Sequence, residues 1–353
     1  MRETVKVLIV DDSAYMRVVL RDMLSSEEGL SVVGTAKDGI EAIEKAKACS
    51  PDVVLLDIQM PRMDGLATLQ RLMKEHPTRV IMLSAMDKVD IDLPLRALEM
   101  GAVEFISKPG GPISVDIVKY RAHIARTILD VSGAKIEVLQ KARIPLQLDK
   151  ERLKPREVPE RGLKAIAIAA STGGPRALEY IFSRLPRNIP ATIFVVQHIP
   201  ALFSESFARR LDSVKGPRTS VAADCAQVKE GHAYVAPGGA HLLVSECSKT
   251  GALMRLDESM PPVQFVKPSA DVLFESASIC FGPRLLAIIL TGMGMDGTNG
   301  AKAVRAAGGR VLAQDEKTSV IYGMPRAAVN AGAAERTISL DEIPKEIVRF
   351  LEE

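Results

Sequence analysis

The chain has 353 residues, of which 47% are hydrophobic and 25% charged, and its formal net charge is +2. This length exceeds one ordinary hydrophobic core and predicts two domains. The near-zero net charge excludes the basic electrostatic footprint of a nucleic-acid-binding protein. A strand-like pattern begins at Val5 and no apolar run has the ~18 residues of a membrane-spanning helix, so we expect no signal peptide and no membrane insertion.

Polar residues end four strand-like apolar runs in the N-terminal third of the chain. In an open parallel sheet the carboxyl ends of the strands share one edge, so we expect these side chains to converge. A single Asp at a strand end is more often a helix cap, but the joint pattern favours a site. The residues are Asp11 and Asp12 after 5–10, Asp57 after 53–56, Ser84 after 80–83 and Lys108 after 103–107.

Three crowded carboxylates repel one another and require a cation or shifted pKa values. The nearby ligands are hard oxygens without His or Cys, which favours Mg²⁺. Lys108 supplies a positive charge for a phosphoryl group, and Ser84 supplies a hydroxyl that can hydrogen-bond it.

With this pattern, residues 1 to about 130 resemble a response-regulator receiver domain. The resemblance implies a flavodoxin-like fold with a five-stranded parallel sheet, in which Asp57 accepts a phosphoryl group from a histidine kinase. It also implies that Mg²⁺ is held by Asp11, Asp12, Asp57 and the carbonyl of Gln59. Phe105 lies where the family keeps its switch aromatic, alongside Ser84 and Lys108.

The apolar spacing over 113–131 predicts a helix that would close this domain, and 135–140 is compatible with its extension. The chain then becomes charged and proline-dotted, a composition that cannot bury much surface. We therefore place a receiver at 1–130, an interdomain linker at 131–162 and a second domain at 163–353.

The second domain repeats an α/β pattern. Apolar runs predict buried strands over 163–170, 191–196, 285–290 and 310–313, and a helix with Pro175 in its first turn follows the first run. Glycine-rich segments such as 233–244 predict antiparallel hairpins. The expected fold is a doubly wound, mostly parallel α/β domain with such hairpins.

Ser171, His198 and Asp296 each follow a predicted buried strand. A serine nucleophile needs a base to take its proton and a carboxylate to orient that base. The order Ser…His…Asp differs from that of the common serine hydrolases, and no G-x-S-x-G elbow is present. The alternative is a phosphate-cradling loop at 171–175, although a full G-x-G-x-x-G is absent. Spacing alone leaves a triad and loop or capping roles both open.

Segments 169–175, 195–200 and 290–297 are similar to the three signature segments of the chemotaxis protein-glutamate methylesterase (CheB) family, and 234–241 and 322–325 are also family-like. A receiver followed by this catalytic half is the family's architecture. The resemblance implies hydrolysis of glutamate γ-methyl esters on chemoreceptors to glutamate and methanol, and deamidation of glutamines, for chemotactic adaptation.

The same resemblance assigns roles to individual residues. Ser171 would be the nucleophile, His198 the base and Asp296 its orienter. Thr172 would help to position His198, and the Met293 N–H would lie in the oxyanion hole. Mg²⁺ would serve receiver phosphorylation, and the esterase reaction would need no cofactor. His76 and His123 are expected at the surface, and His232 and His241 in structural roles.

The implied partners are the cytoplasmic part of methyl-accepting chemoreceptors and a chemotaxis histidine kinase, with no nucleic acid, and we expect a monomer.

Four dispersed cysteines, without a C-x-x-C pair, indicate buried thiols in a cytoplasmic protein, with neither a disulfide framework nor a zinc site. An alternative function is a phosphorylation-controlled receptor-docking module without esterase activity. A DNA-binding regulator is excluded because the second half shows no helix-turn-helix pattern and no basic face.

Overall fold

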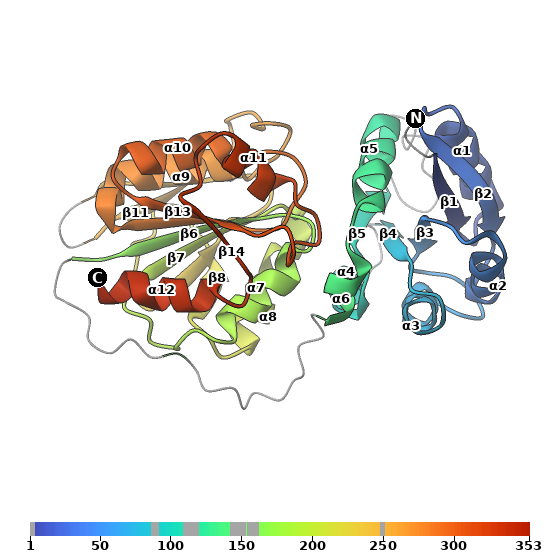
Figure 1. Ribbon diagram of the computed structural model, residues 1–353, viewed down its shortest axis with the longest axis horizontal. Helices are drawn as coiled ribbons and strands as arrows, with labels where there is room; N and C mark the ends of the chain where they lie inside the picture. Colours follow the sequence, from blue (N-terminus) through green and yellow to red (C-terminus); the bar gives the residue numbers. More distant parts are fainter. Residues whose placement is uncertain (1–3, 86–91, 109–119, 142–152, 154–161, 248–250) are drawn as a thin grey trace. The chain divides into compact units, whose positions relative to one another are not determined.

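The computed structural model describes residues 4–85, 92–108, 120–141, 153, 162–247 and 251–353. The chain forms two compact units, Met1–Arg143 and Ile144–Glu353 (Figure 1). The division falls within the predicted linker, most of which lies outside the described residues. Residues 113–119 of the predicted helix lie outside the described residues, and the rest of it corresponds to α5 (Arg121–Ser132). The suggested extension is a separate short helix, α6 (Ile136–Lys141).

The N-terminal unit contains the predicted five-stranded parallel sheet, in the order β2-β1-β3-β4-β5. Helices α1 and α5 contact each other, and α3 contacts both α2 and α4, so helices cover the sheet in two groups. The strands are β1 (Val5–Val10), β2 (Leu30–Ala36), β3 (Val53–Asp57), β4 (Arg79–Ala85) and β5 (Glu104–Lys108). The helices of this unit that come before α5 are α1 (Ala14–Ser25), α2 (Gly39–Cys49), α3 (Gly65–Glu75) and α4 (Leu93–Met100).

Burial and capping explain these elements. Every residue of the central strand β3 is buried, as expected for a parallel strand covered on both faces. Asp38 accepts hydrogen bonds from two backbone N–H groups at the start of α2, and Asp64 accepts one from Ala67 at the start of α3. Caps of this kind typically stabilise a helix by about 1 kcal/mol.

The C-terminal unit contains a seven-stranded parallel sheet in the order β14-β13-β12-β6-β7-β9-β8. Figure 1 shows α9, α10 and α11 on one face of this sheet and α7, α8 and α12 on the other. The strands are β6 (Ala165–Ala170), β7 (Thr192–Gln197), β8 (Arg218–Val221), β9 (His232–Val235), β12 (Leu285–Ile289), β13 (Arg310–Gln314) and β14 (Arg336–Ile338). The helices are α7 (Gly174–Phe182), α8 (Ser204–Ser213), α9 (Ala270–Phe281), α10 (Thr298–Ala306), α11 (Met324–Asn330) and α12 (Ile343–Glu352).

The predicted hairpin over 233–244 is wrong. Strand β9 pairs in parallel with β7 and β8, whereas β10 (His241–Ser245) pairs antiparallel with β11 (Leu253–Asp257) in a separate two-stranded sheet. The glycines between β9 and β10 therefore mark a change of sheet. Gly238 needs its lack of a side chain because a Cβ there would lie 2.4 Å from the backbone nitrogen of Ala201.

Strand β6 lies at the point where the strand order of the sheet reverses. From β6 the chain continues to β7 on one side, and it returns later to β12 on the other side. Connections that leave neighbouring strands in opposite directions open a crevice at their carboxyl ends. The topology therefore predicts a site where β6, β7 and β12 end.

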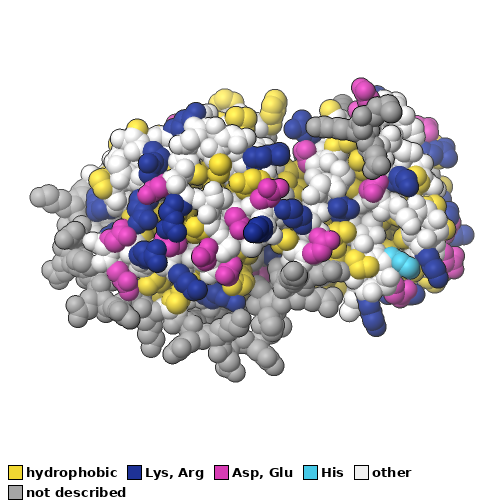
Figure 2. Space-filling view, viewed as in Figure 1, with side chains coloured by type: hydrophobic (Ala, Val, Ile, Leu, Met, Phe, Trp, Pro, Cys, Tyr) yellow, Lys and Arg dark blue, Asp and Glu magenta, His cyan; other side chains and the backbone are white. Residues whose placement is uncertain are grey.

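The surface carries mixed charges. On the face drawn in Figure 2, Lys and Arg side chains are interspersed with Asp and Glu over both units. Within the described parts of the chain, no helix is long and apolar enough to cross a lipid bilayer.

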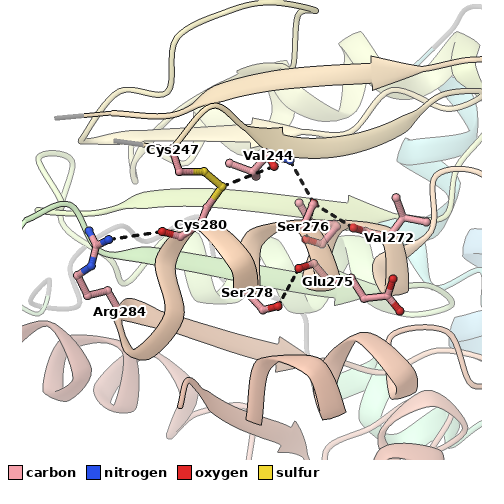
Figure 3. Close-up of a disulfide and its surroundings, with 9 residues drawn as sticks. Val244, Cys247, Val272, Glu275, Ser276, Ser278, Cys280 and Arg284 are labelled. Carbon is pink, nitrogen blue, oxygen red and sulfur yellow. Dashed lines mark hydrogen bonds between the residues drawn. A yellow bond between two sulfur atoms is a disulfide. The ribbon is translucent and has the colours of Figure 1, made fainter. Parts of the chain in front are cut away.

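The cysteines contradict the expectation of free, buried thiols. Cys247 and Cys280 form a disulfide, with Cα atoms 5.3 Å apart (Figure 3). The bond connects the chain just after β10 to the last turn of α9, which packs against β10. Cys225 is exposed and Cys49 half-buried, and both are free. The pairing depends on packing between segments 33 residues apart, so the cysteine spacing could not reveal it.

Candidate active site

The register of two neighbouring strands places Ser171 beside His198. Ala170 of β6 pairs with Gln197 of β7, and the next residue on each strand is Ser171 and His198. The His198 N–H donates to the Ala170 carbonyl at 3.1 Å, which continues the ladder by one step. Both residues are partly buried at the sheet edge. The structure thus brings together two of the predicted site residues.

Asp296 comes to the same edge from the loop after β12. Its Oδ2 lies 2.8 Å from His198 Nε2. The carboxylate also accepts hydrogen bonds from Ser269 Oγ at 2.6 Å, from the Ala270 N–H at 2.7 Å and from the Asp271 N–H at 3.1 Å. These last donors form the N-terminal end of α9, where the helix dipole favours a negative charge.

The hydrogen bonds determine the ionisation of Asp296. Burial by itself would raise the pKa of this carboxyl, but the bonds from His198, Ser269 and Ala270 hold the pKa below its ordinary value. Asp296 is therefore an ionised group facing one nitrogen of the imidazole. With Nε2 directed to Asp296, Nδ1 is the nitrogen left to interact with a neighbouring hydroxyl.

The loop after β12 packs directly against Ser171. The Ser171 N–H donates to the Thr291 carbonyl at 3.1 Å. A Cβ at Gly292 would lie 2.7 Å from the Cβ of Ser171, so only glycine permits this approach. Met293 follows at once, and a Cβ at Gly323 would lie 3.2 Å from its Cα. The backbone at Met293 is therefore held close to the serine.

The Ser171 side chain has no hydrogen bond to His198 among the described residues. Hydrogen bonds of this kind are often long in the free form of an enzyme and tighten when substrate binds. Thr172 is buried, and its carbonyl accepts from Thr291 Oγ1 at 3.0 Å. These contacts tie the β6 and β12 loops together.

Two supporting residues, Gln197 and Ser269, were missed in the sequence analysis. Gln197 Nε2 donates to the carbonyls of Ser171 and His198, at 3.0 Å and 3.3 Å, and thereby links the two loops. Ser269 donates to Asp296 and its N–H donates to Nδ1 of the fully buried His241 at 3.1 Å. His241 is structural, as expected. Gln197 could have been found from the sequence because it directly precedes His198, whereas no sequence pattern marked Ser269 as a site residue.

The remaining histidines, His76, His123 and His232, have the expected exposure only in part. His123 is exposed, and His76 is half-buried at the end of α3. His232 is half-buried at the start of β9.

A second constellation lies in the N-terminal unit. Ligand oxygens of Asp11, Asp12 and Asp57 lie within 4.8 Å of one another. Lys108 Nζ contacts Asp11 Oδ2 at 2.7 Å and Asp57 Oδ2 at 3.0 Å. A set of clustered carboxylate oxygens fits a hard divalent cation such as Mg²⁺.

Burial dominates the electrostatics of this acidic cluster. It raises the pKa of Asp57 to about 6, against the lowering effect of Lys108 and with added repulsion from Asp11. Burial by itself would lower the pKa of Lys108, but Asp57 and Asp11 raise it above its ordinary value. The lysine is therefore a fixed positive charge between two carboxylates.

The remaining predicted receiver residues lie on or directly after β3, β4 and β5. Ser84 is in β4, paired with Ser107 of β5, and Phe105 is buried in β5. Gln59 follows β3 and lines a pocket of about 420 Å³ together with Ile58, Met60, Asp64, Leu66 and Leu93.

Comparison with known proteins finds a matching family model for each unit. The CheB methylesterase family model matches residues 166–347, and the response regulator receiver domain model matches residues 7–116. The chain is 42% identical to a protein-glutamate methylesterase/protein-glutamine glutaminase of Pyrococcus horikoshii, over 100% of this chain and 95% of that protein. It is 42% identical to the protein of the same name from Geobacillus kaustophilus, over 99% of this chain and 100% of that protein. The crystal structure of the Thermotoga maritima CheB methylesterase catalytic domain is 39% identical, with a TM-score of 0.51, and covers 53% of this chain and 98% of that chain.

Proposed function

Because the chain belongs to the CheB methylesterase family and carries a response regulator receiver domain, we propose that it hydrolyses glutamate γ-methyl esters on chemoreceptors under the control of receiver phosphorylation. It would also deamidate specific receptor glutamines, as the name of its relatives indicates. The observation that carries the proposal is the hydrogen bond from His198 to an ionised Asp296 beside Ser171.

In the proposed reaction Ser171 Oγ attacks the γ-carbonyl carbon of the ester. His198 Nδ1 takes the hydroxyl proton, and Asp296 stabilises the resulting imidazolium at Nε2. The carbonyl oxygen becomes an oxyanion next to the Met293 N–H, and a preorganised donor of this kind contributes about 3 to 4 kcal/mol.

The tetrahedral intermediate collapses when its C–O bond to the methoxy group breaks and His198 returns the proton to that oxygen, so methanol leaves. Water then attacks the acyl-enzyme, with His198 again as base, and releases the glutamate carboxylate and Ser171. With glutamine as substrate the leaving group is ammonia. Thr172 is proposed to help to position His198.

In the receiver, Asp57 is the proposed phosphoryl acceptor, with a chemotaxis histidine kinase as the donor. Asp11, Asp12, Asp57 and the Gln59 carbonyl would hold Mg²⁺, which neutralises phosphoryl charge when bound. Lys108 lies within contact of Asp57 and is placed to pair with the added phosphoryl oxygens. Ser84 and Phe105 are the proposed switch residues. We place the enzyme in the cytoplasm as a monomer.

The unphosphorylated receiver is proposed to obstruct access of receptors to the catalytic unit, and phosphorylation to relieve that obstruction. This follows from a phosphoacceptor joined to a hydrolase through a linker. Deletion of residues 1–132 should raise the basal rate of methanol release. An unchanged basal rate in a folded, active fragment would contradict obstruction.

The test of the proposed function is methanol release from methylated chemoreceptor membranes. Wild-type protein should release methanol, and a small-molecule phosphodonor with Mg²⁺ should increase the rate. Ser171→Ala should release none under either condition. If wild-type protein also releases none, the receptor-docking alternative replaces the esterase.

A further inference from the structure

Phe265 is fully exposed at the tip of a tight turn. Val263 and Val266 exchange both backbone hydrogen bonds, at 3.1 Å and 3.0 Å, around the two residues between them. Those residues, Gln264 and Phe265, have φ angles of 51° and 68°. Positive φ at both central positions defines the turn type that strongly prefers Asn-Gly.

A phenylalanine in this position costs stability and recovers none of it by burial. A bulky residue pays for the left-handed conformation that glycine adopts freely, and an aromatic ring in water gains nothing from burial. Strained residues persist where surrounding structure holds them, and they concentrate at functional sites. The turn therefore presents an apolar side chain at a position where folding alone would favour glycine.

Hydrogen bonds connect this turn to the catalytic pair. Gln264 Nε2 donates to Asp271 Oδ2 at 2.8 Å. The Asp271 N–H donates to Asp296 at 3.1 Å, and Asp296 binds His198 at 2.8 Å. On the other side of the turn, the Lys267 carbonyl accepts from the Gly239 N–H at 3.2 Å. The position of the ring is thus set by the same framework that orients the imidazole.

Two more exposed apolar residues lie on the loops that carry the catalytic residues. Met295 directly precedes Asp296 and is 51% exposed, and Leu202 follows His198 in the short 3₁₀ helix Ala201–Phe203 and is 42% exposed. Single exposed apolar residues are ordinary, but Met295 and Leu202 lie on the loops of Asp296 and His198, and Phe265 lies in the turn that is hydrogen-bonded through Gln264 to Asp271. Ile279, 86% exposed near the opposite end of α9, provides a natural comparison.

We propose that Phe265 anchors the protein substrate, by binding an apolar side chain of the polypeptide segment that flanks the esterified glutamate. Met295 and Leu202 would extend the same contact. This inference rests on the proposed function. An ester side chain alone offers little area for binding, whereas a rigid aromatic gives large contact area at small entropic cost.

The test uses the full-length protein activated by phosphodonor and Mg²⁺, and compares Phe265→Gly with Ile279→Ala. The substrates are a methylated receptor fragment and a small blocked glutamate γ-methyl ester. Phe265→Gly should raise KM for the receptor fragment about tenfold, with kcat and small-ester hydrolysis unchanged. Its melting temperature should stay equal or rise, because glycine relieves the turn. Ile279→Ala should match wild type throughout.

Equal loss on both substrates, or no change on either, would overturn the anchoring role. An increased basal rate in unphosphorylated Phe265→Gly, with an unchanged KM after activation, would mean that the ring serves inhibition by the receiver. That result would also overturn the anchoring role. Binding of the receptor fragment to Ser171→Ala, with and without Phe265→Gly, separates this inference from the proposed function. Weaker binding in the double variant supports the anchor even if wild-type protein hydrolyses neither substrate, and equal binding refutes it.

Discussion

Asp296 holds His198 Nε2 at 2.8 Å and at the same time accepts hydrogen bonds from two backbone N–H groups at the start of α9. The orientation of the imidazole is therefore coupled to the position of a helix. The contact with His198, and then the hydrogen bonds from Ser269 and Ala270, hold the pKa of the buried Asp296 carboxyl below its ordinary value, so Asp296 is both a site residue and a structural one.

Substitution Asp296→Asn should remove most of the activity. The amide keeps the shape but lacks the charge that supports the imidazolium, and its N–H₂ group favours the wrong imidazole tautomer. In a serine protease triad the equivalent change lowers kcat by about 10⁴, and we expect a similar loss of methanol release. Ser269→Ala, which removes one hydrogen bond and keeps the charge, should cost much less. Near-wild-type activity of Asp296→Asn would refute the assigned role.

Stability should depend on the ionisation of Asp296 in acid. Its folded-state pKa lies below its ordinary value, so the unfolded chain takes up the proton first as pH falls. The contribution is complete above the unfolded pKa of about 4 and is lost as pH falls through the folded pKa. Urea unfolding of wild type and Asp296→Asn should therefore differ most above pH 4 and converge in stronger acid. A constant difference would contradict this linkage.

Gly292→Ala should inactivate the enzyme. The added Cβ would lie 2.7 Å from Ser171 Cβ and 2.5 Å from Met324 Sδ, so the serine must move. Overpacking of this kind costs about 1 to 3 kcal/mol of stability, and displacement of the nucleophile should lower kcat further. Gly251→Ala, whose Cβ would meet its nearest atom at 3.4 Å, is the control. The prediction is checked by measuring kcat and urea unfolding of both variants. An active Gly292→Ala would contradict it, because the loop would then accommodate the added Cβ.

Activation should require both Asp57 and a divalent cation. Asp57→Asn removes the phosphoryl acceptor, and chelation of Mg²⁺ removes the charge that the acidic cluster needs. In either case a phosphodonor should leave methanol release at the unphosphorylated level. Radiolabel transfer to the protein measures the first step directly. Activation of Asp57→Asn by the phosphodonor would place the acceptor elsewhere.

The disulfide should contribute measurable stability. Closing a loop between residues 33 apart restricts the unfolded chain by an amount that the chain-entropy model puts at about 3 to 4 kcal/mol. A phosphine reductant should therefore lower the unfolding midpoint of the wild-type protein in urea. The Cys247→Ser/Cys280→Ser double variant should start at the lower value and not respond to reductant. A wild-type midpoint unaffected by full reduction would contradict this contribution.

Both α/β sheets, and the strand ends where Asp57, Ser171 and His198 lie, were predictable from the local sequence pattern. This succeeded because buried parallel strands are short apolar runs and their carboxyl ends share one edge. The local pattern carried that information without reference to distant parts of the chain.

Features that depend on contacts between segments far apart in the chain were not predictable in this way. Packing of α9 against β10 brought Cys247 to Cys280, and docking of Asp296 on α9 brought in Ser269. The segment after β9 changed sheets because β9 found parallel partners in β7 and β8. The left-handed turn at Phe265 is likewise invisible in the sequence, since Gln-Phe carries no turn signal of its own and the backbone conformation is imposed by its surroundings.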